Sequence, residues 1–305
     1  MKVLVIGGCG FIGSHVVDML LEQGHGVRVL DRRHEAFRDP LPPVDYRLGD
    51  CAEPFEMLEA LEGIDAVIQA AGASVPSTSN IDPEADILGN LIPTLRLLDL
   101  MRQQGIGRMV YLSSGGAVYG VTRTDPVSED HPQQPISSYG IVKGAVEKYL
   151  YMEEALHGLK TVVLRPSNPY GPRQGHTGIQ GVIGTWLWRI SRGEPVEIWG
   201  DGSVVRDFIH VRDLARLCVR ALVSGQSGVF NAGAGQGTSI NEVLASVRRA
   251  TGLPIQPVYR KGRDYDVPRI VLDIARARAA FDWSPETPLE DGLAETWDWI
   301  RSREA

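Results

Sequence analysis

The sequence predicts an α/β fold, in which a doubly wound parallel sheet is followed by a smaller C-terminal domain. In the first half, short apolar runs alternate with longer amphipathic stretches. The runs cover residues 3–6, 27–30, 66–70 and 109–112, and the stretches cover residues 12–23 and 86–103. Strands buried on both faces of a sheet and helices that cover those faces produce this alternation.

The alternation ends after a helix over residues 139–156 and a buried run over residues 161–164, because three prolines within residues 166–172 interrupt regular structure. We therefore expect a first domain over residues 1–165, with return segments near residues 206–232. The second domain is expected to span mainly residues 166–305. Its predicted helices cover residues 181–192, 211–223 and 240–251.

Composition narrows the class of protein. The 305 residues carry a net charge of −7 with both signs mixed along the chain, which argues against a nucleic-acid or membrane-surface binder. The three cysteines are far apart and form no CxxC pair, so neither a disulfide framework nor a metal site is expected. No apolar run approaches the length of about 18 residues that a membrane span needs. A cytoplasmic protein is the simplest expectation.

Residues 7–13 form a glycine motif, GGCGFIG, directly after the first predicted strand and at the start of the first helix. Glycines let this turn close and bring backbone N–H groups at the positive helix end against a pyrophosphate. A glycine pattern alone also fits an ordinary turn, but strand, glycines and helix in this order predict a dinucleotide-binding, Rossmann-type domain. The expected contacts are Gly7, Gly10, Phe11, Ile12 and Gly13.

Asp31 ends the second predicted strand, where a carboxylate accepts hydrogen bonds from the adenosine ribose. It favours NAD because a carboxylate repels the 2′-phosphate of NADP. The alternative is that Arg32, also expected at the cofactor, or Arg33 holds that phosphate. Further cofactor contacts are expected at the ends of the next two strands, at Asp50, Cys51, Ala70, Ala71 and Gly72.

Tyr139 and Lys143 lie four residues apart near a helix start and therefore share one face. At roughly 4 Å an ammonium favours a phenolate by about 4 kcal/mol. We therefore expect Lys143 to lower the pKa of Tyr139 from about 10 toward neutrality, where a general base is effective. Taken alone, this spacing also fits a tyrosine packed on the sheet and a solvated lysine.

Together, these motifs resemble those of the extended short-chain dehydrogenase/reductases over essentially the whole chain. The motifs are GGCGFIG, Asp31, Ser113-Ser114 before Val118-Tyr119-Gly120, Tyr139 with Lys143, and RPSNPYGP at residues 165–172. Within that class, the chain most resembles the nucleotide-sugar 4-epimerases of the NAD-dependent epimerase/dehydratase family. The resemblance implies that Tyr139 is the base, Lys143 binds the nicotinamide ribose, and Asn90 stabilises its helix.

The resemblance also implies NAD as the cofactor and a nucleotide sugar, with a UDP-hexose first, as the substrate. It implies that the substrate is contacted by Ser114, Asn168, Arg206, Arg263 and Asp266. Guanidinium groups match phosphate oxygens. Without the resemblance, the two arginines also fit ion pairs with neighbouring aspartates, and Asn168 fits a turn between prolines. The sugar and the base stay open.

One position departs from the family's pattern. The catalytic Ser or Thr of the family falls on Gly115, so we expect either that Ser114 takes over or that water and Tyr139 suffice. Gly116 and Ala117 stand where related dehydratases and decarboxylases carry acidic residues, which argues against those reactions. The predicted reaction is 4-epimerisation. The alternatives are an NAD(P)-dependent nucleotide-sugar ketoreductase or dehydrogenase, and a non-catalytic dinucleotide-binding sensor.

A homodimer is expected from the amphipathic stretches at residues 86–103 and 139–156, which the resemblance places in a four-helix bundle with their copies in a partner. Both stretches carry more apolar residues than one core-facing stripe requires. The residues concerned include Leu88, Leu91, Ile92, Val142, Val146 and Leu150.

Overall fold

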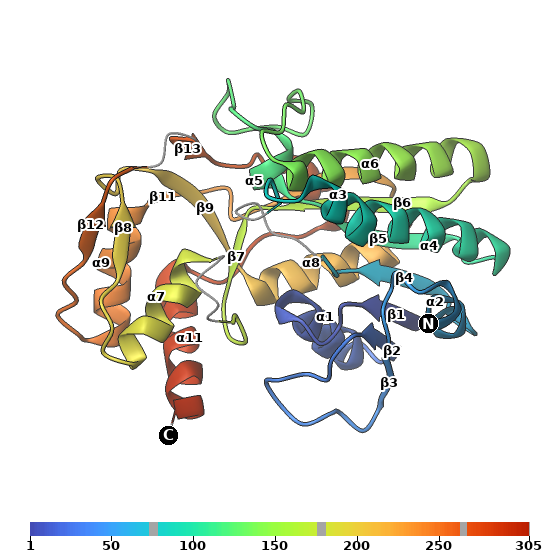
Figure 1. Ribbon diagram of the computed structural model, residues 1–305, viewed down its shortest axis with the longest axis horizontal. Coiled ribbons are helices and arrows are strands. Elements are labelled where there is room, and N and C mark those ends of the chain that lie inside the picture. The colour runs from blue at the N-terminus through green and yellow to red at the C-terminus, as the bar shows by residue number, and fades with distance from the viewer. Residues whose placement is uncertain (73–78, 176–180, 263–266, 305) are drawn as a thin grey trace.

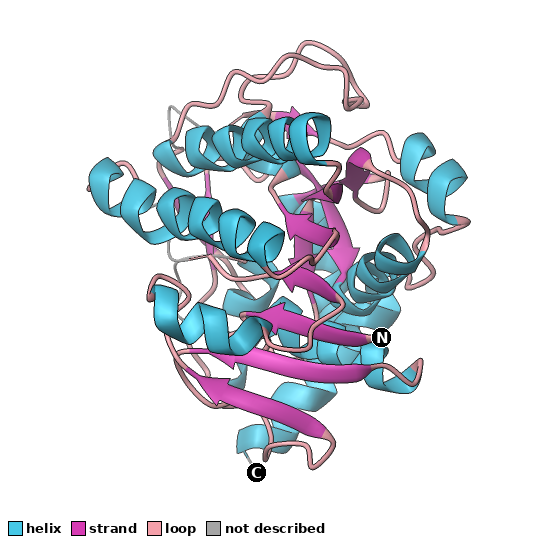
Figure 2. Cartoon of the chain, turned by 90° about the vertical axis from the view of Figure 1, so that its right-hand side faces the viewer, coloured by secondary structure: helices cyan, strands magenta, loops and turns pink. Residues whose placement is uncertain are grey.

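The computed structural model describes residues 1–72, 79–175, 181–262 and 267–304. Within these residues, a seven-stranded parallel sheet carries helices on both faces, and a smaller unit with short strands lies beside it (Figures 1 and 2). The predicted doubly wound α/β class is therefore confirmed.

The order of the large sheet creates a crevice between its two halves. The strands run β10-β6-β5-β4-β1-β2-β3, so the chain leaves β1 in one direction and later returns to its other side at β4. Ligands of doubly wound sheets bind at the carboxyl ends of the strands at such a switch point. The strands are β1 (Lys2–Ile6), β2 (Gly26–Asp31), β3 (Val44–Leu48), β4 (Ala66–Gln69), β5 (Arg108–Leu112), β6 (Lys160–Pro166) and β10 (Gly228–Ala232).

The two faces of the sheet carry separate cores. Val3 and Val5 of β1 pack in a cluster with α1 and α8, whereas Leu4 and Ile6 pack with α2, α4 and α6. This alternation follows from the period of two along a strand and explains the unbroken apolar run at residues 3–6. The helices around this sheet are α1 (Phe11–Glu22), α2 (Pro54–Leu61), α3 (Pro83–Asp86), α4 (Ile92–Gln103), α5 (Gly115–Val118), α6 (Ser138–His157) and α8 (Val211–Val223).

A π-helical segment, η1 (Ile87–Leu91), joins α3 to α4 within the stretch predicted as one helix. Pro93 has no N–H to donate to the preceding turn. The Asn90 side chain donates to the Asp86 carbonyl oxygen at 3.0 Å and to the Asp86 carboxylate at 2.8 Å. These side-chain hydrogen bonds replace part of the regular α-helical backbone hydrogen bonding, which accounts for the wider, π-helical turn.

The smaller unit is built from short strands and three helices. Its strand β9 (Val205–His210) pairs with β7 (Asn168–Tyr170), β11 (Gly237–Ser239) and β13 (Arg269–Ile270), while β8 (Glu197–Trp199) pairs with β12 (Val258–Arg260). Side chains of α7 (Val182–Ser191), α9 (Ile240–Thr251) and α11 (Leu289–Glu304) form the core of this unit. Helix α10 (Ala275–Phe281) packs against β10 of the large sheet.

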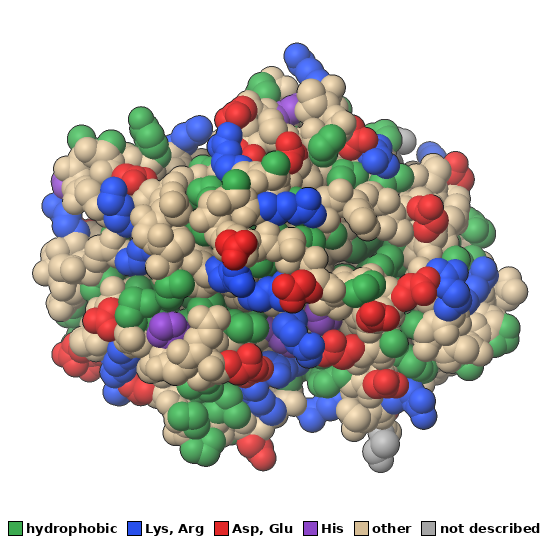
Figure 3. All heavy atoms as spheres, turned by 180° about the vertical axis from the view of Figure 1, so that it is seen from behind, with side chains coloured by type: hydrophobic (Ala, Val, Ile, Leu, Met, Phe, Trp, Pro, Cys, Tyr) green, Lys and Arg blue, Asp and Glu red, His purple; other side chains and the backbone are tan. Residues whose placement is uncertain are grey.

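Charged side chains of both signs are interspersed over the face seen in Figure 3, without a broad field of one sign. Of the helices in the described part of the chain, none has the length and apolar character to cross a membrane.

Candidate active site

The glycine motif forms a close-packed cradle at the switch point of the sheet. Gly7 has φ of +81°, and a Cβ there would lie 2.7 Å from the backbone nitrogen of Ala71. A Cβ on Gly13 would lie 2.0 Å from the Gly7 carbonyl oxygen. Both positions therefore require glycine. The cradle leads into α1, whose first N–H groups have no partner within the helix and fit a pyrophosphate.

Asp31 is held against this cradle from the end of β2. Its carboxylate accepts the N–H of Cys9 at 3.1 Å and that of Arg33 at 3.4 Å. The side chain of Asp31 thus lies beside the glycine turn, in the place that suits a ribose, while Arg32 is exposed. Asp50, at the end of β3, accepts the N–H of Ala52 at 2.9 Å.

The remaining expected cofactor residues follow β3 or β4, at the same edge of the sheet. Cys51, Ala70 and Ala71 are half-buried, and Gly72 is exposed. Together with Gly10, Phe11 and Ile12 at the start of α1, they follow the carboxyl ends of β1, β3 and β4, the edge at which doubly wound sheets bind dinucleotides. The structure thus brings together at one edge the cofactor residues that the sequence suggested.

Lys143 is buried beneath Tyr139 on α6, and its ammonium binds the end of β5. Nζ donates to the Leu112 carbonyl oxygen at 2.7 Å and lies 4.7 Å from the centre of the Tyr111 ring. It lies 5.7 Å from the centre of the Tyr139 ring. Burial lowers the pKa of Lys143 to about 8, against the opposing effects of Glu147 and Asp86.

The expected lowering of the Tyr139 pKa is wrong in this structure. Burial raises the pKa of Tyr139 to about 12, a hydrogen bond with the Ser114 side chain lowers it, and Asp86 raises it further. Lys143 is not among the groups that shift this pKa, and its ammonium donates to the Leu112 carbonyl oxygen. The partner of the Tyr139 phenol is therefore Ser114.

Packing around Gly115 explains why no hydroxyl stands there. A Cβ on this residue would lie 2.6 Å from Cδ1 of Leu272 and 3.0 Å from the carbonyl oxygen of Arg165. A serine at this position would need Leu272 and the neighbouring backbone to move. Ser114 is one residue upstream, at the N-cap of α5, and its hydroxyl already bonds Tyr139.

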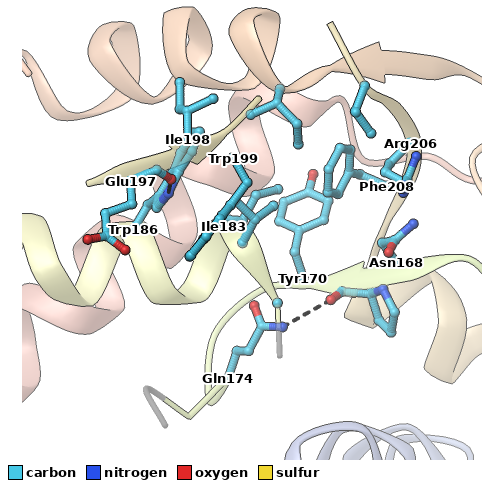
Figure 4. Close-up of a pocket in the computed structure, with 15 residues that line it drawn as sticks. Asn168, Tyr170, Gln174, Ile183, Trp186, Glu197, Ile198, Trp199, Arg206 and Phe208 are labelled. Carbon is cyan, nitrogen blue, oxygen red and sulfur yellow. Dashed lines mark hydrogen bonds between the residues drawn. The ribbon is translucent and has the colours of Figure 1, made fainter. Parts of the chain in front are cut away.

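A cavity of about 230 Å³ opens beyond the carboxyl end of β6, between β7, β9 and α7 (Figure 4). The pairing of β7 with β9 brings two of the expected substrate residues, Asn168 and Arg206, to the same side of this cavity. Asn168 donates to the Asp207 carbonyl oxygen at 2.8 Å, and Arg206 donates to that of Val267 at 2.6 Å. Two more of the expected substrate residues, Arg263 and Asp266, lie outside the described residues.

Aromatic residues of the cavity were missed by the sequence analysis. Trp199 is 42% exposed at the rim, and Tyr170 and Phe208 line the interior. A flat, half-exposed aromatic ring suits a nucleobase. The signal in the sequence was a tryptophan directly before the turn Gly200-Asp201-Gly202. A large apolar side chain beside such a turn indicates contact with a partner or a ligand.

Comparisons with known proteins agree with this geometry. The model of the NAD dependent epimerase/dehydratase family matches residues 3–233. A UDP-glucose 4-epimerase of Mycolicibacterium smegmatis is 35% identical over 316 residues, which cover 99% of each chain.

Among solved structures, the UDP-glucose 4-epimerase of Thermotoga maritima with UDP-glucose is 36% identical, with a TM-score of 0.96 and 100% of both chains covered. The UDP-glucose 4-epimerase of Thermus thermophilus in complex with NAD is 35% identical, with a TM-score of 0.91 and 99% of both chains covered.

Proposed function

This chain belongs to the NAD-dependent epimerase/dehydratase family, and on that premise we propose that it inverts nucleotide sugars at C4, with UDP-hexoses as its substrates. The observation that carries the proposal is the hydrogen-bonded pair of Ser114 and Tyr139 above buried Lys143. This group lies at the same edge of the sheet as the glycine cradle and the cavity of Asn168 and Arg206.

Each part of the site has a role in the proposed reaction. Bound NAD would supply the reversible hydride acceptor that inversion at the sugar C4 requires. Tyr139 removes the proton from the sugar O4 and later gives it back, and Ser114 holds O4 by a hydrogen bond. Lys143 binds the nicotinamide ribose. Asn168 and Arg206, with Arg263 and Asp266, bind the nucleotide diphosphate.

The sequence and the sheet topology support the proposal that one domain binds the cofactor and the other mainly binds the substrate. Residues 1–165 with the return segments near 206–232 hold the cofactor, and residues 166–305 mainly hold the nucleotide sugar. In support, the large sheet takes its edge strand β10 from the return segments, and the described cavity lies mainly in the smaller unit.

The test is to incubate the purified protein, without added cofactor, with UDP-, dTDP- and GDP-hexoses and to look for the 4-epimers. We expect UDP-glucose and UDP-galactose to interconvert, and we expect NAD to be released when the protein is denatured. A ketoreductase would instead require added NAD(P)H and would yield a reduced sugar. Product formation only under those conditions would refute epimerisation.

We also propose a homodimer formed through η1, α4 and α6, in which α4 and α6 run side by side (Figure 1). Large apolar side chains of η1 and α6 are exposed in the single chain, including Leu88 at 56% and Ile141 at 58%. Others of this kind on α6 are Tyr151, Met152 and Leu156. Three of the residues first expected at this surface, Val142, Val146 and Leu150, are instead buried in the single chain. Val146 and Leu150 belong to the core between α6 and the sheet.

Light scattering at micromolar concentration should give about twice the 33.4 kDa mass of the chain. The exposed apolar side chains of η1 and α6 are unfavourable in water, and contact with the same surface of a second copy would remove them from solvent. A mass of one chain under these conditions would contradict the dimer.

A further inference from the structure

Three successive residues at the end of β5 contact three residues on one face of α6. The Leu112 carbonyl oxygen accepts Nζ of Lys143, the Ser113 hydroxyl donates to Glu147, and Ser114 bonds Tyr139. Positions 139, 143 and 147 are four residues apart and therefore lie along one helix face. Glu147 thus completes a row in which the other two members are the proposed catalytic residues.

Glu147 is a buried carboxylate with a complete set of partners. The residue is 5% exposed, and both of its carboxylate oxygens are bound by Arg165 of β6, from Nη2 at 2.6 Å and from Nε at 3.0 Å. Gln133 donates to the same carboxylate. Arg165 in turn donates to the Tyr119 hydroxyl at 2.8 Å. A bidentate pair in such a network fixes the carboxylate in one place.

The titratable groups that face Lys143 come from several elements. Glu147 and Tyr139 lie on its own helix, Asp86 approaches from α3, and Tyr111 approaches from β5. Burial lowers the pKa of Lys143, and Glu147 is the first of the groups that oppose this effect. Arg165 binds the Glu147 carboxylate and is not among the groups that shift the pKa of Lys143.

We propose that Glu147 is a positioning residue that keeps Lys143 protonated and holds it in line with the end of β5. The carboxylate does not act on the sugar; it acts through the ammonium one helical turn away. The proposal rests on the proposed epimerase function, in which Lys143 must stay charged to hold the ribose. It explains why the chain buries an Arg–Glu pair behind its catalytic residues, although such a pair by itself is weak support for stability.

The test is the titration of Lys143 in the NAD-containing protein. The chain has only five lysines, so NMR of protein labelled with ¹³C at lysine Cε resolves each of them, and Lys143→Arg assigns the signal. In Glu147→Gln the side chain keeps its shape but loses its charge. We expect the Lys143 midpoint to fall by about one pH unit, since an anion about 6 Å away favours the ammonium. The pH at which kcat levels off should fall with it.

Two further variants separate charge from folding and from hydrogen bonding. Glu147→Gln leaves Arg165 buried without its ion-pair partner, so Glu147→Gln with Arg165→Met removes both charges together. We expect the Lys143 midpoint to fall in this double variant as well, because the carboxylate, unlike Arg165, lies on the α6 face that carries Lys143. Ser113→Ala removes the hydrogen bond from β5 but keeps the carboxylate, and should leave the midpoint in place.

An unchanged Lys143 midpoint in the folded double variant would overturn the proposal. So would an equal fall in Ser113→Ala, because the hydrogen bond rather than the charge would then be responsible. The NMR titration does not depend on turnover. A wild-type protein that fails to epimerise any sugar but shows the expected titration would therefore refute the proposed function and not the effect of Glu147 on Lys143.

Discussion

Tyr139→Phe should reduce kcat for 4-epimerisation by about 10²- to 10⁴-fold, the usual contribution of a general base. The variant removes the phenol that Ser114 holds and leaves the backbone N–H of residue 139, which donates to Ser79 at 3.1 Å. The fold and the bound NAD should therefore survive. The measurement is kcat for UDP-galactose conversion, together with the NAD released on denaturation.

The pH dependence of the wild type follows from the same two residues. Tyr139 acts as a base only as the phenolate, and burial raises its pKa to about 12, so kcat should increase with pH on the acid side. Lys143 must keep its proton, and its pKa is about 8, so above that pH the loss of this proton offsets the further gain in phenolate and kcat should level off. Tyr139→Phe should lose the rising limb. A variant that keeps a tenth or more of the wild-type rate would show that another group removes the proton.

Ser114→Ala should reduce kcat by about 10- to 1000-fold, a loss of about 1.4 to 4 kcal/mol of transition-state stabilisation. The Ser114 hydroxyl bonds Tyr139 and lowers its pKa, so its removal should also move the rising limb of the pH profile to higher pH. KM should change less than kcat, because the hydroxyl acts on the reacting oxygen and not on the nucleotide.

Ser114→Thr is the matched control, because it retains the hydroxyl and should keep most of the activity. Adding Gly115→Ser to Ser114→Ala should not restore the rate, since the side chain at residue 115 would meet Leu272 and the Arg165 carbonyl oxygen. If Ser114→Ala turns over like the wild type while Tyr139→Phe is inactive, Tyr139 works with Lys143 and solvent alone.

The sequence predicted the large sheet well, because its strands and helices are long enough to show a period. The expected helix at residues 211–223 matches α8, and that at residues 240–251 matches α9. The small sheets were not predicted, since β7 and β13 contain only three and two residues. Runs of this length show no measurable hydrophobic period, and both of these strands form by pairing with β9.

For the site, the sequence located Tyr139 and Lys143 but misjudged their electrostatics. A positive charge four residues away favours a lowered Tyr139 pKa, but burial, which depends on the whole fold, raises this pKa instead. The hydrogen bond from Lys143 to the Leu112 carbonyl oxygen also depends on the fold and leaves no mark in the sequence. The choice between Gly115 and Ser114 likewise depends on Leu272, which lies more than 150 residues further along the chain.

The position of β10 has a consequence for synthesis on the ribosome. β10 pairs with β6 at the edge of the large sheet, and α8 packs against α1, yet both follow the smaller unit's first strands in the chain. A nascent chain that has just emerged as far as residue 166 therefore has an unpaired β6 edge and an uncovered apolar face on α1. Such surfaces favour association with other chains. The large sheet can be completed only after residue 232 leaves the exit tunnel, because β10 is its last strand in the chain.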